Sequence, residues 1–204
     1  MKTVVYVDGF NLYYGALKGT PYRWLNLVKL CQLMLPRDDI RQIKYFTALV
    51  TSRAKNPDQA TRQQTYLRAL QTILNLQIIY GHFLSHEIMM PLVPPRTGQV
   101  KVIKTEEKGS DVNLAIHLVS DGFRNAYDAA VIVSNDSDLL PPIQFVKEEL
   151  GKLVGILNPQ KHGSVVLAAT AHFVKNIRPN VLRNSQFPTT LTDAKGRFTK
   201  PTRW

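Results

Sequence analysis

The sequence predicts an α/β fold, a three-layer α/β/α sandwich around a mainly parallel central sheet. Short runs of consecutive apolar residues, typical of strands buried on both faces, alternate with segments whose apolar residues recur at helical spacing. The clearest of these runs is 129–133, which is entirely small or β-branched. No internal repeat or low-complexity tract interrupts the alternation, so we expect one sheet with helices on both faces.

The composition is that of a globular protein of one main domain. The chain has 204 residues, of which 44% are hydrophobic and 20% charged, enough to bury a core and too apolar for wholesale disorder. The first apolar run is short and ends at Asp8, which indicates a strand and not a signal peptide. No apolar run has the length of a membrane span, and we expect a cytoplasmic protein. A single cysteine, Cys31, excludes an internal disulfide and a multi-cysteine zinc site.

The expected strands are 2–7, 43–50, 76–80, 129–133 and 152–157, with a short final strand at 173–177. The first breaks at Gly9, which supplies a tight turn into a helix. A second helix covers the amphipathic segment 24–35, and a third opens at Asn56-Pro57-Asp58. We expect the third helix to bury Leu67, Leu70, Ile73 and Leu74.

The later helices follow clear boundary signals. Gly109 and Ser110 introduce one whose expected buried stripe is Val112, Ala115, Ile116, Val119 and Phe123. Another ends at Gly151, as C-terminal glycines do, and Ser164 caps the helix 165–171. We interpret His117, on the first of these helices, as a structural or surface residue.

The segment 81–98 has a weaker pattern. Residues 88–93 and 100–104 are expected to form a hairpin or a covering flap, with Lys101 and Lys104 facing outward. His82 and His86 have a helical metal-ligand spacing, but the segment is not convincingly helical, which disfavours zinc.

The net charge of +11 is concentrated at the C-terminal end, because 152–204 holds nine Lys or Arg and one acid. A basic body suits a polyanion such as nucleic acid, although a merely soluble basic protein would look the same. We divide the chain into a main domain, 1–183, and a basic tail, 184–204, that should wrap the body or be mobile. As a basic arm, the tail could hold nucleic acid.

Aspartates occupy the ends of the predicted strands and the starts of helices. Asp8 follows the first strand, Asp136 and Asp138 follow 129–133, and Asp111 lies in a first helical turn. Because carboxyl ends of parallel strands share one edge of a sheet, these side chains should meet. Capping explains one acid in each turn, but not the pair. Oxygen ligands select Mg²⁺ or Mn²⁺, and such clusters usually serve phosphodiester hydrolysis with one or two metals.

Three segments resemble the NYN-domain family, also called LabA-like, a branch of the PIN-like metal-dependent nucleases. They are VDGFNLY at 7–13, EEKGSDVN at 106–113 and VSNDSDL at 133–139, and the tail segments 185–188 and 200–204 also look like the endings of bacterial members. Asn135 and Leu139 depart from the commoner glycine and phenylalanine of the family, beside the predicted ligands.

The resemblance implies a PIN-like sheet, a divalent metal held by the four aspartates, and single-stranded or structured RNA as substrate. Asn11 and Ser134 would assist, although Asn11 could equally cap its helix. Arg53, Lys55 and Lys108 are candidate phosphate contacts, but basic loop residues are more often only solvated.

The leading hypothesis is an Mg²⁺- or Mn²⁺-dependent endoribonuclease. A non-catalytic RNA-binding regulator that retains the acidic pocket is the alternative, and a phosphohydrolase of small nucleotides is a third. Single-stranded DNA is a second candidate substrate. A homodimer and a protein regulator would also be compatible with the sequence.

Overall fold

The computed structural model describes residues 1–52, 54 and 56–204. Its centre is a six-stranded sheet with the order β3-β2-β1-β6-β7-β8, in which every neighbouring pair is parallel. The strands are β1 (Lys2–Asp8), β2 (Asp39–Thr47), β3 (Leu76–Tyr80), β6 (Ala129–Val133), β7 (Leu153–Asn158) and β8 (Phe173–Asn176). The predicted parallel sheet is confirmed.

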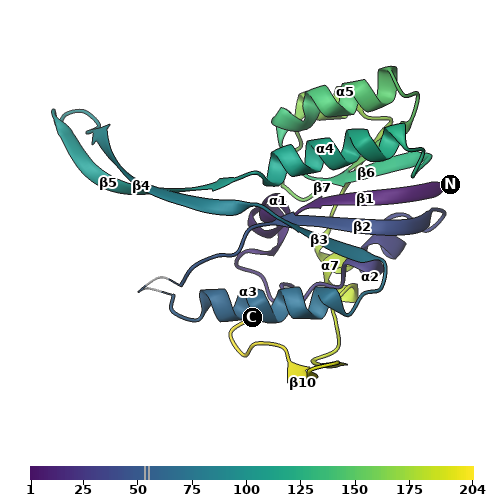
Figure 1. The fold of residues 1–204 in the computed structure, drawn as a ribbon, viewed down its shortest axis with the longest axis horizontal. Helices are drawn as coiled ribbons and strands as arrows, with labels where there is room; N and C mark the ends of the chain where they lie inside the picture. Colours follow the sequence, from purple (N-terminus) through teal and green to yellow (C-terminus); the bar gives the residue numbers. More distant parts are fainter. Residues whose placement is uncertain (53, 55) are drawn as a thin grey trace.

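Helices cover both faces of the sheet (Figure 1). On one face lie α4 (Ser110–Phe123) and α5 (Leu140–Glu148), and on the other α2 (Leu27–Met34), α3 (Gln59–Gln71) and α7 (Pro179–Asn184). The remaining helical segments are α1 (Gly9–Leu12), the π-helical turn η1 (Tyr13–Leu17), the 3₁₀ turn η2 (Ser137–Leu139) and α6 (Val165–Thr170). The three-layer arrangement is therefore the predicted one.

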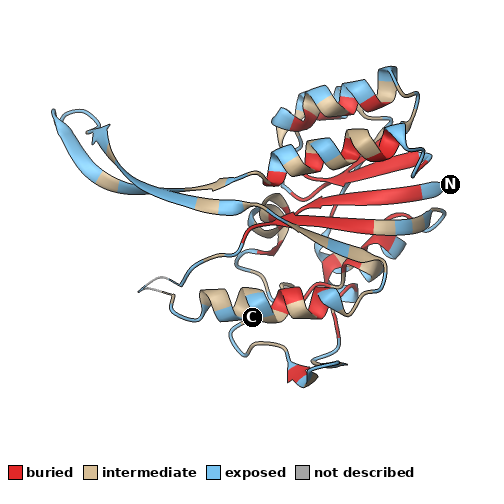
Figure 2. Ribbon diagram, in the orientation of Figure 1, coloured by how far each residue is buried: buried red, intermediate tan, exposed pale blue. Residues whose placement is uncertain are grey.

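Two hydrophobic clusters, one on each face, hold the layers together. Because side chains alternate along a strand, β1 sends Val5 and Val7 into one cluster and Val4 and Tyr6 into the other. All four side chains are at most 2% exposed. The central strands are accordingly the most continuously buried part of the ribbon (Figure 2).

The second helix starts later than its apolar pattern suggests. The segment before α2 pairs with the tail: the Asn26 N–H donates to the Ser185 carbonyl at 2.7 Å, and the Phe187 N–H donates to the Trp24 carbonyl at 2.9 Å. The Asn26 side chain then caps α2 by accepting from the Lys29 N–H at 3.1 Å. The expected burial of Leu74 is wrong, because α3 ends at Gln71 and Leu74 is fully exposed.

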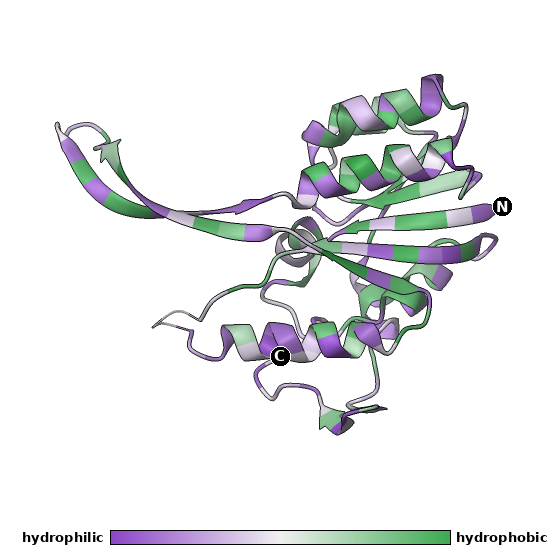
Figure 3. Cartoon of the chain, in the orientation of Figure 1, coloured by the Kyte–Doolittle hydropathy of each residue, from purple (hydrophilic) through white to green (hydrophobic). Residues whose placement is uncertain are grey.

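Helix α4 buries a different face from the one its apolar stripe predicts. Val112, Ile116 and Phe123 are 59–62% exposed. The buried positions are Ser110, Leu114, Leu118, Asp121 and Gly122. Gly122 explains part of the choice, because a Cβ at this position would lie 2.8 Å from the Tyr127 hydroxyl oxygen. An apolar strip of α4 therefore remains on the surface (Figure 3).

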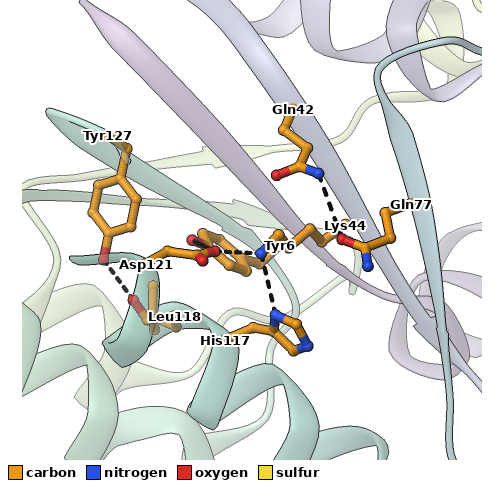
Figure 4. Close-up of polar contacts among 8 residues, drawn as sticks. All are labelled: Tyr6, Gln42, Lys44, Gln77, His117, Leu118, Asp121 and Tyr127. Atoms are coloured by element: carbon orange, nitrogen blue, oxygen red, sulfur yellow. Dashed lines mark hydrogen bonds and ion pairs between the residues drawn. The ribbon is translucent and has the colours of Figure 1, made fainter. Parts of the chain in front are cut away.

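A buried polar cluster fixes the orientation of α4 (Figure 4). The Tyr6 hydroxyl and the Lys44 ammonium both donate to Asp121 Oδ2, at 2.8 and 2.6 Å. The Lys44 Nζ also lies 3.1 Å from His117 Nδ1. Burial and the adjacent Lys44 lower the pKa of His117. His117 is thus a structural residue, one of the two roles expected for it.

The hairpin of β4 (His82–Pro91) and β5 (Gln99–Lys108) is longer than predicted and forms an arm. Its strands are paired from His82↔Lys108 to Pro91↔Gln99. The arm projects away from the body and exposes apolar and charged side chains along its length (Figures 1 to 3). The predicted hairpin is confirmed, with Lys101 and Lys104 exposed as expected. It touches the body at its base, where the Phe83 ring packs on Phe10 with a centroid distance of 5.7 Å.

The tail wraps the body, one of its two predicted behaviours. It begins at the last residue of α7 and contains a small hairpin of β9 (Thr190–Asp193) and β10 (Gly196–Thr199). The Arg68 guanidinium on α3 binds the Asp193 carboxylate at 2.6 and 2.7 Å. The Trp204 ring packs on Trp24 and Tyr66, with centroid distances of 5.9 and 5.3 Å. Within the residues that the structure describes, none of the helices has the length and apolar character that a bilayer crossing requires.

Candidate active site

Asp8 lies at the carboxyl end of β1 and caps the following helix. Its Oδ1 accepts the Asn11 N–H at 2.8 Å, and its Oδ2 accepts the Ser134 hydroxyl at 3.0 Å. The turn after Asp8 requires glycine, since a Cβ on Gly9 would lie 2.7 Å from the Phe46 carbonyl and the Tyr45 ring. The carboxylate is 5% exposed and held from both sides.

The environment of Asp8 disfavours its negative charge. Burial is the largest cause, and the nearby carboxylates of Asp111 and Asp136 add to it. The hydrogen bonds from Asn11 and Ser134 act in the opposite direction. The net result raises the pKa of Asp8 to about 6.

Asp136 and Asp138 follow β6, next to β1 in the sheet. The pairing Val7↔Val133 places the two strand ends side by side. The Ser134 hydroxyl oxygen accepts the Asp136 N–H at 3.1 Å, and Asp136 Oδ1 accepts the Asp138 N–H at 3.0 Å. Asp136 is therefore the cap of the short turn η2, whereas Asp138 lies exposed in its first turn.

Asp111 lies in the first turn of α4. Burial and then Asp136, Glu107 and Asp138 raise its pKa, so the four predicted aspartates share one electrostatic neighbourhood. Glu107, which was not predicted, closes the start of α4: it accepts from the Ser110 N–H at 3.2 Å and the Ser110 hydroxyl at 2.6 Å. No capping box signalled this role, because in that motif the acid follows the serine by three residues, whereas Glu107 precedes Ser110.

The chemistry of this donor set fits a hard divalent cation. Among the described residues, none of the ion pairs involves Asp8, Asp111, Asp136 or Asp138, so within this part of the chain no basic side chain lies within 4.0 Å of these acids to offset their repulsion. Their oxygens are of the type that Mg²⁺ and Mn²⁺ prefer. In the same described part of the chain, no three His, Cys, Asp or Glu side chains are already arranged as a metal-holding group. The acids are neighbours without forming a completed coordination shell.

A network of side-chain amides braces the loops beside the acids. Asn11 Oδ1 accepts the Asn135 N–H at 3.0 Å and the Gln160 Nε2 at 3.3 Å. Asn135 in turn donates to the His162 carbonyl at 3.1 Å and accepts the Ser164 N–H at 2.6 Å. The Asn11 side chain therefore holds the loop after β6. Asn135 and Gln160 were missed because loop amides have no periodic pattern.

The predicted substrate contacts have different positions. Ser134 is fully buried, where its hydroxyl positions Asp8. Lys108, at the end of β5, is half exposed and lies 3.6 Å from Glu106. Arg53 and Lys55 fall outside the described residues.

Comparisons with known proteins agree with this architecture. A family model described as the NYN domain matches residues 2–178. A protein named 6-hydroxy-3-succinoylpyridine 3-monooxygenase HspA, from Pseudomonas putida strain S16, is 30% identical over 236 aligned positions, which cover 100% of this chain and 75% of that protein. A crystal structure of a Vibrio parahaemolyticus protein of unknown function aligns with a TM-score of 0.59 and 15% identity, covering 87% of this chain and 93% of that one. This last likeness concerns the fold alone.

Proposed function

The chain belongs to the NYN-domain family, and from this premise we propose that it is a divalent-metal-dependent ribonuclease that hydrolyses RNA phosphodiester bonds. The carboxylates that would carry the reaction are Asp8, Asp111, Asp136 and Asp138. The observation that carries the proposal is the buried Asp8, whose pKa is raised to about 6 by burial and by two of these neighbours. Perturbed carboxylates that gather at a sheet edge are typical of functional sites.

Some residues of the site would bind the metal ion, and others would hold those ligands and their loops in position. Asp8, Asp136 and Asp138 would hold Mg²⁺ or Mn²⁺, and Asp111 would bind it or orient the attacking water. When bound, the ion supplies Lewis-acid activation of the phosphodiester and of water. Ser134 would keep the Asp8 carboxylate in one orientation, and Asn11 would keep the loop after β6 in place. The net charge of +11 favours association with a polyanion.

The test is cleavage of labelled RNA, single-stranded DNA and duplex DNA, with Mn²⁺ or with EDTA. Asp138→Asn should lower RNA cleavage by at least about 100-fold, since it removes a carboxylate from the site and keeps its shape. Asp39→Asn is the matched control, because Asp39 lies at the opposite end of its strand in an exposed pair with Arg41. Equal cleavage by Asp138→Asn and wild type would remove these acids from the chemistry.

The alternative from the same family premise is an RNA-binding regulator that cuts nothing. It predicts RNA affinity that weakens steeply with salt and no product with any metal. The uncompensated acids disfavour it, because a surface that only binds RNA gains nothing from four neighbouring carboxylates.

The Pseudomonas relative provides a second candidate, oxidation of a heteroaromatic compound. Its support is the 30% identity along the whole of this chain and the monooxygenase name of that protein. Oxygen uptake with 6-hydroxy-3-succinoylpyridine and a reduced nicotinamide would test it directly. Turnover of the pyridine without cleavage of RNA would favour heteroaromatic oxidation over RNA hydrolysis.

A further inference from the structure

A cavity of about 320 Å³ opens beside Asp8, on the side of α1 that faces α3. This volume is at the lower end of the range of about 300–1,000 Å³ that small-ligand sites occupy. Residues from α1, η1 and the loop after it, from β2, from α3 and from the chain end surround it. The lining side chains used below are Tyr13, Tyr14, Lys18, Arg23, Tyr45, Arg62 and Trp204.

Aromatic rings form much of its wall. Tyr13 and Tyr14 lie edge to face, with a centroid distance of 5.3 Å, and Tyr14 is 62% exposed at the rim. Tyr45 is buried at the base of the cavity. Its ring packs against the backbone of Gly9, where a side chain would not fit. Burial and then the charge of Asp8 raise the pKa of Tyr45, which shows that its hydroxyl is within electrostatic range of the acidic site. Trp204 contributes a further ring.

The charge of the lining is entirely positive among the described residues, with Lys18, Arg23 and Arg62 and no Asp or Glu. The Lys18 ammonium lies 4.8 Å from the centroid of Tyr14. Arg23 donates through Nε to the Thr20 carbonyl at 3.1 Å, which orients its guanidinium. Arg62 is more constrained, since it binds Asn56 and lies 3.8 Å from Asp58. Two of the three cations, Lys18 and Arg23, have no carboxylate within ion-pair distance in this part of the structure.

We propose that this cavity binds one nucleotide of the RNA strand, with the base stacked against the tyrosines and Trp204 and the phosphate held by Lys18 and Arg23. Aromatic faces that accept any base, combined with cations that follow the backbone, are the usual means of holding single-stranded nucleic acid. Gly9 lines the cavity and directly follows Asp8, and the charge of Asp8 acts on Tyr45 at the base, so the cavity adjoins the acidic site. The assignment deepens the proposed ribonuclease function and rests on it for the identity of the polymer.

The experiment is isothermal titration calorimetry of the full chain in EDTA, where no cleavage occurs. The probes are adenosine and uridine 5′-monophosphate, ribose 5-phosphate, which lacks the base, and pyridine-3-carboxylate, a small heteroaromatic acid. Both nucleotides should bind at least about tenfold more tightly than either of the other probes. Tyr14→Ala and Lys18→Gln should each weaken nucleotide binding by about tenfold. Both residues are exposed at the rim, so neither variant threatens folding, and Lys29→Gln, an exposed lysine outside the cavity, should bind as wild type does.

The outcomes separate this assignment from the ribonuclease proposal. Nucleotide binding that both rim variants weaken supports the assignment, even if Asp138→Asn cleaves RNA as well as wild type and the ribonuclease proposal fails. The assignment is overturned by a wild-type protein that binds no nucleotide, by equal or tighter binding of ribose 5-phosphate or the pyridine acid, or by rim variants that bind like Lys29→Gln. In each of these cases the cleavage assay still decides the chemistry of the aspartates independently.

Discussion

The hydroxyl of Ser134 donates a 3.0 Å hydrogen bond to the buried carboxylate of Asp8 and accepts a 3.1 Å hydrogen bond from the N–H of Asp136. One side chain therefore links the ends of β1 and β6. It also favours the charged form of Asp8, in opposition to burial and to the neighbouring acids. The ionisation of Asp8 depends on this contact.

Ser134→Ala should move the acid limb of the RNA-cleavage pH profile to higher pH. Without the hydroxyl, the pKa of Asp8 rises further above its present value of about 6, so a larger fraction of the carboxyl is protonated at pH 7. A hydrogen bond to a charged group is worth about 1.5–3 kcal/mol, so we expect a loss of about 2- to 15-fold in rate at pH 7 that largely recovers at pH 9. The measurement is the pH–rate profile, and a profile that overlays the wild type would contradict the role of Ser134.

Metal binding should weaken as the pH falls through about 6. A carboxyl must lose its proton to bind a cation, and Asp8 retains its proton below that pH. Calorimetric titration with Mn²⁺ at pH 5 and pH 7.5 should give much tighter binding at the higher pH, with proton release in the intermediate range. Asp8→Asn should bind weakly at both pH values. Equal affinities at pH 5 and pH 7.5 for the wild type would exclude Asp8 as a ligand.

Asp121→Ala should destabilise the fold by about 3–5 kcal/mol, because it leaves the ammonium of Lys44 buried without its carboxylate partner. Urea unfolding is the measurement, with Asp39→Asn as the control. The pair of Asp39 with Arg41 is more than half exposed and should contribute less than about 1 kcal/mol. If Asp121→Ala lowered the free energy of unfolding no more than Asp39→Asn does, the buried pair would not fix the position of α4.

The tail should loosen in acid. Arg68, the larger cause, and the Lys195 N–H lower the pKa of Asp193 from 3.8 to about 2. A lowered folded-state pKa means that the stabilisation is present above about pH 4 and is lost as the pH falls towards 2. Limited proteolysis by pepsin between pH 4 and pH 2 should therefore show increasing cleavage near the β9–β10 hairpin. Asp193→Asn should be cleaved there already at pH 4, and a pattern like that of the wild type would contradict the role of the ion pair.

The centre of the sheet could be predicted from the sequence because β1 and β6 are buried on both faces. The residues 129–133 match β6 in full, since a continuous apolar run of this length has few alternatives. The residues 76–80 also match β3 in full, although that edge strand is only partly buried. The shared edge of parallel strands also predicted that Asp8 and Asp136 would be neighbours, as the contribution of Asp136 to the raised pKa of Asp8 indicates.

Tertiary contacts determine features of the fold that the apolar pattern of the sequence leaves open. Helix α4 has apolar residues on more than one face. The buried face is selected by Lys44, which is distant in sequence and binds Asp121, and by the close packing of Leu150 and Tyr127 at Gly122. The start of α2 depends on pairing with the tail. The cavity beside Asp8 is assembled from four separate parts of the chain, of which only 7–13 belongs to a segment that the sequence had singled out.

The arm formed by β4 and β5 is paired only with itself along most of its length, and its side chains are largely exposed. A two-stranded ribbon without a packed face has little to oppose local opening. Amide protons in the arm should therefore exchange with deuterated solvent long before those of β1 and β6, which open only when the whole protein unfolds. The amide protons would then fall into a fast-exchanging class in the arm and a slow-exchanging class in the sheet. Shortening the arm by matched pairs of residues would leave the exchange rates of the slow class unchanged.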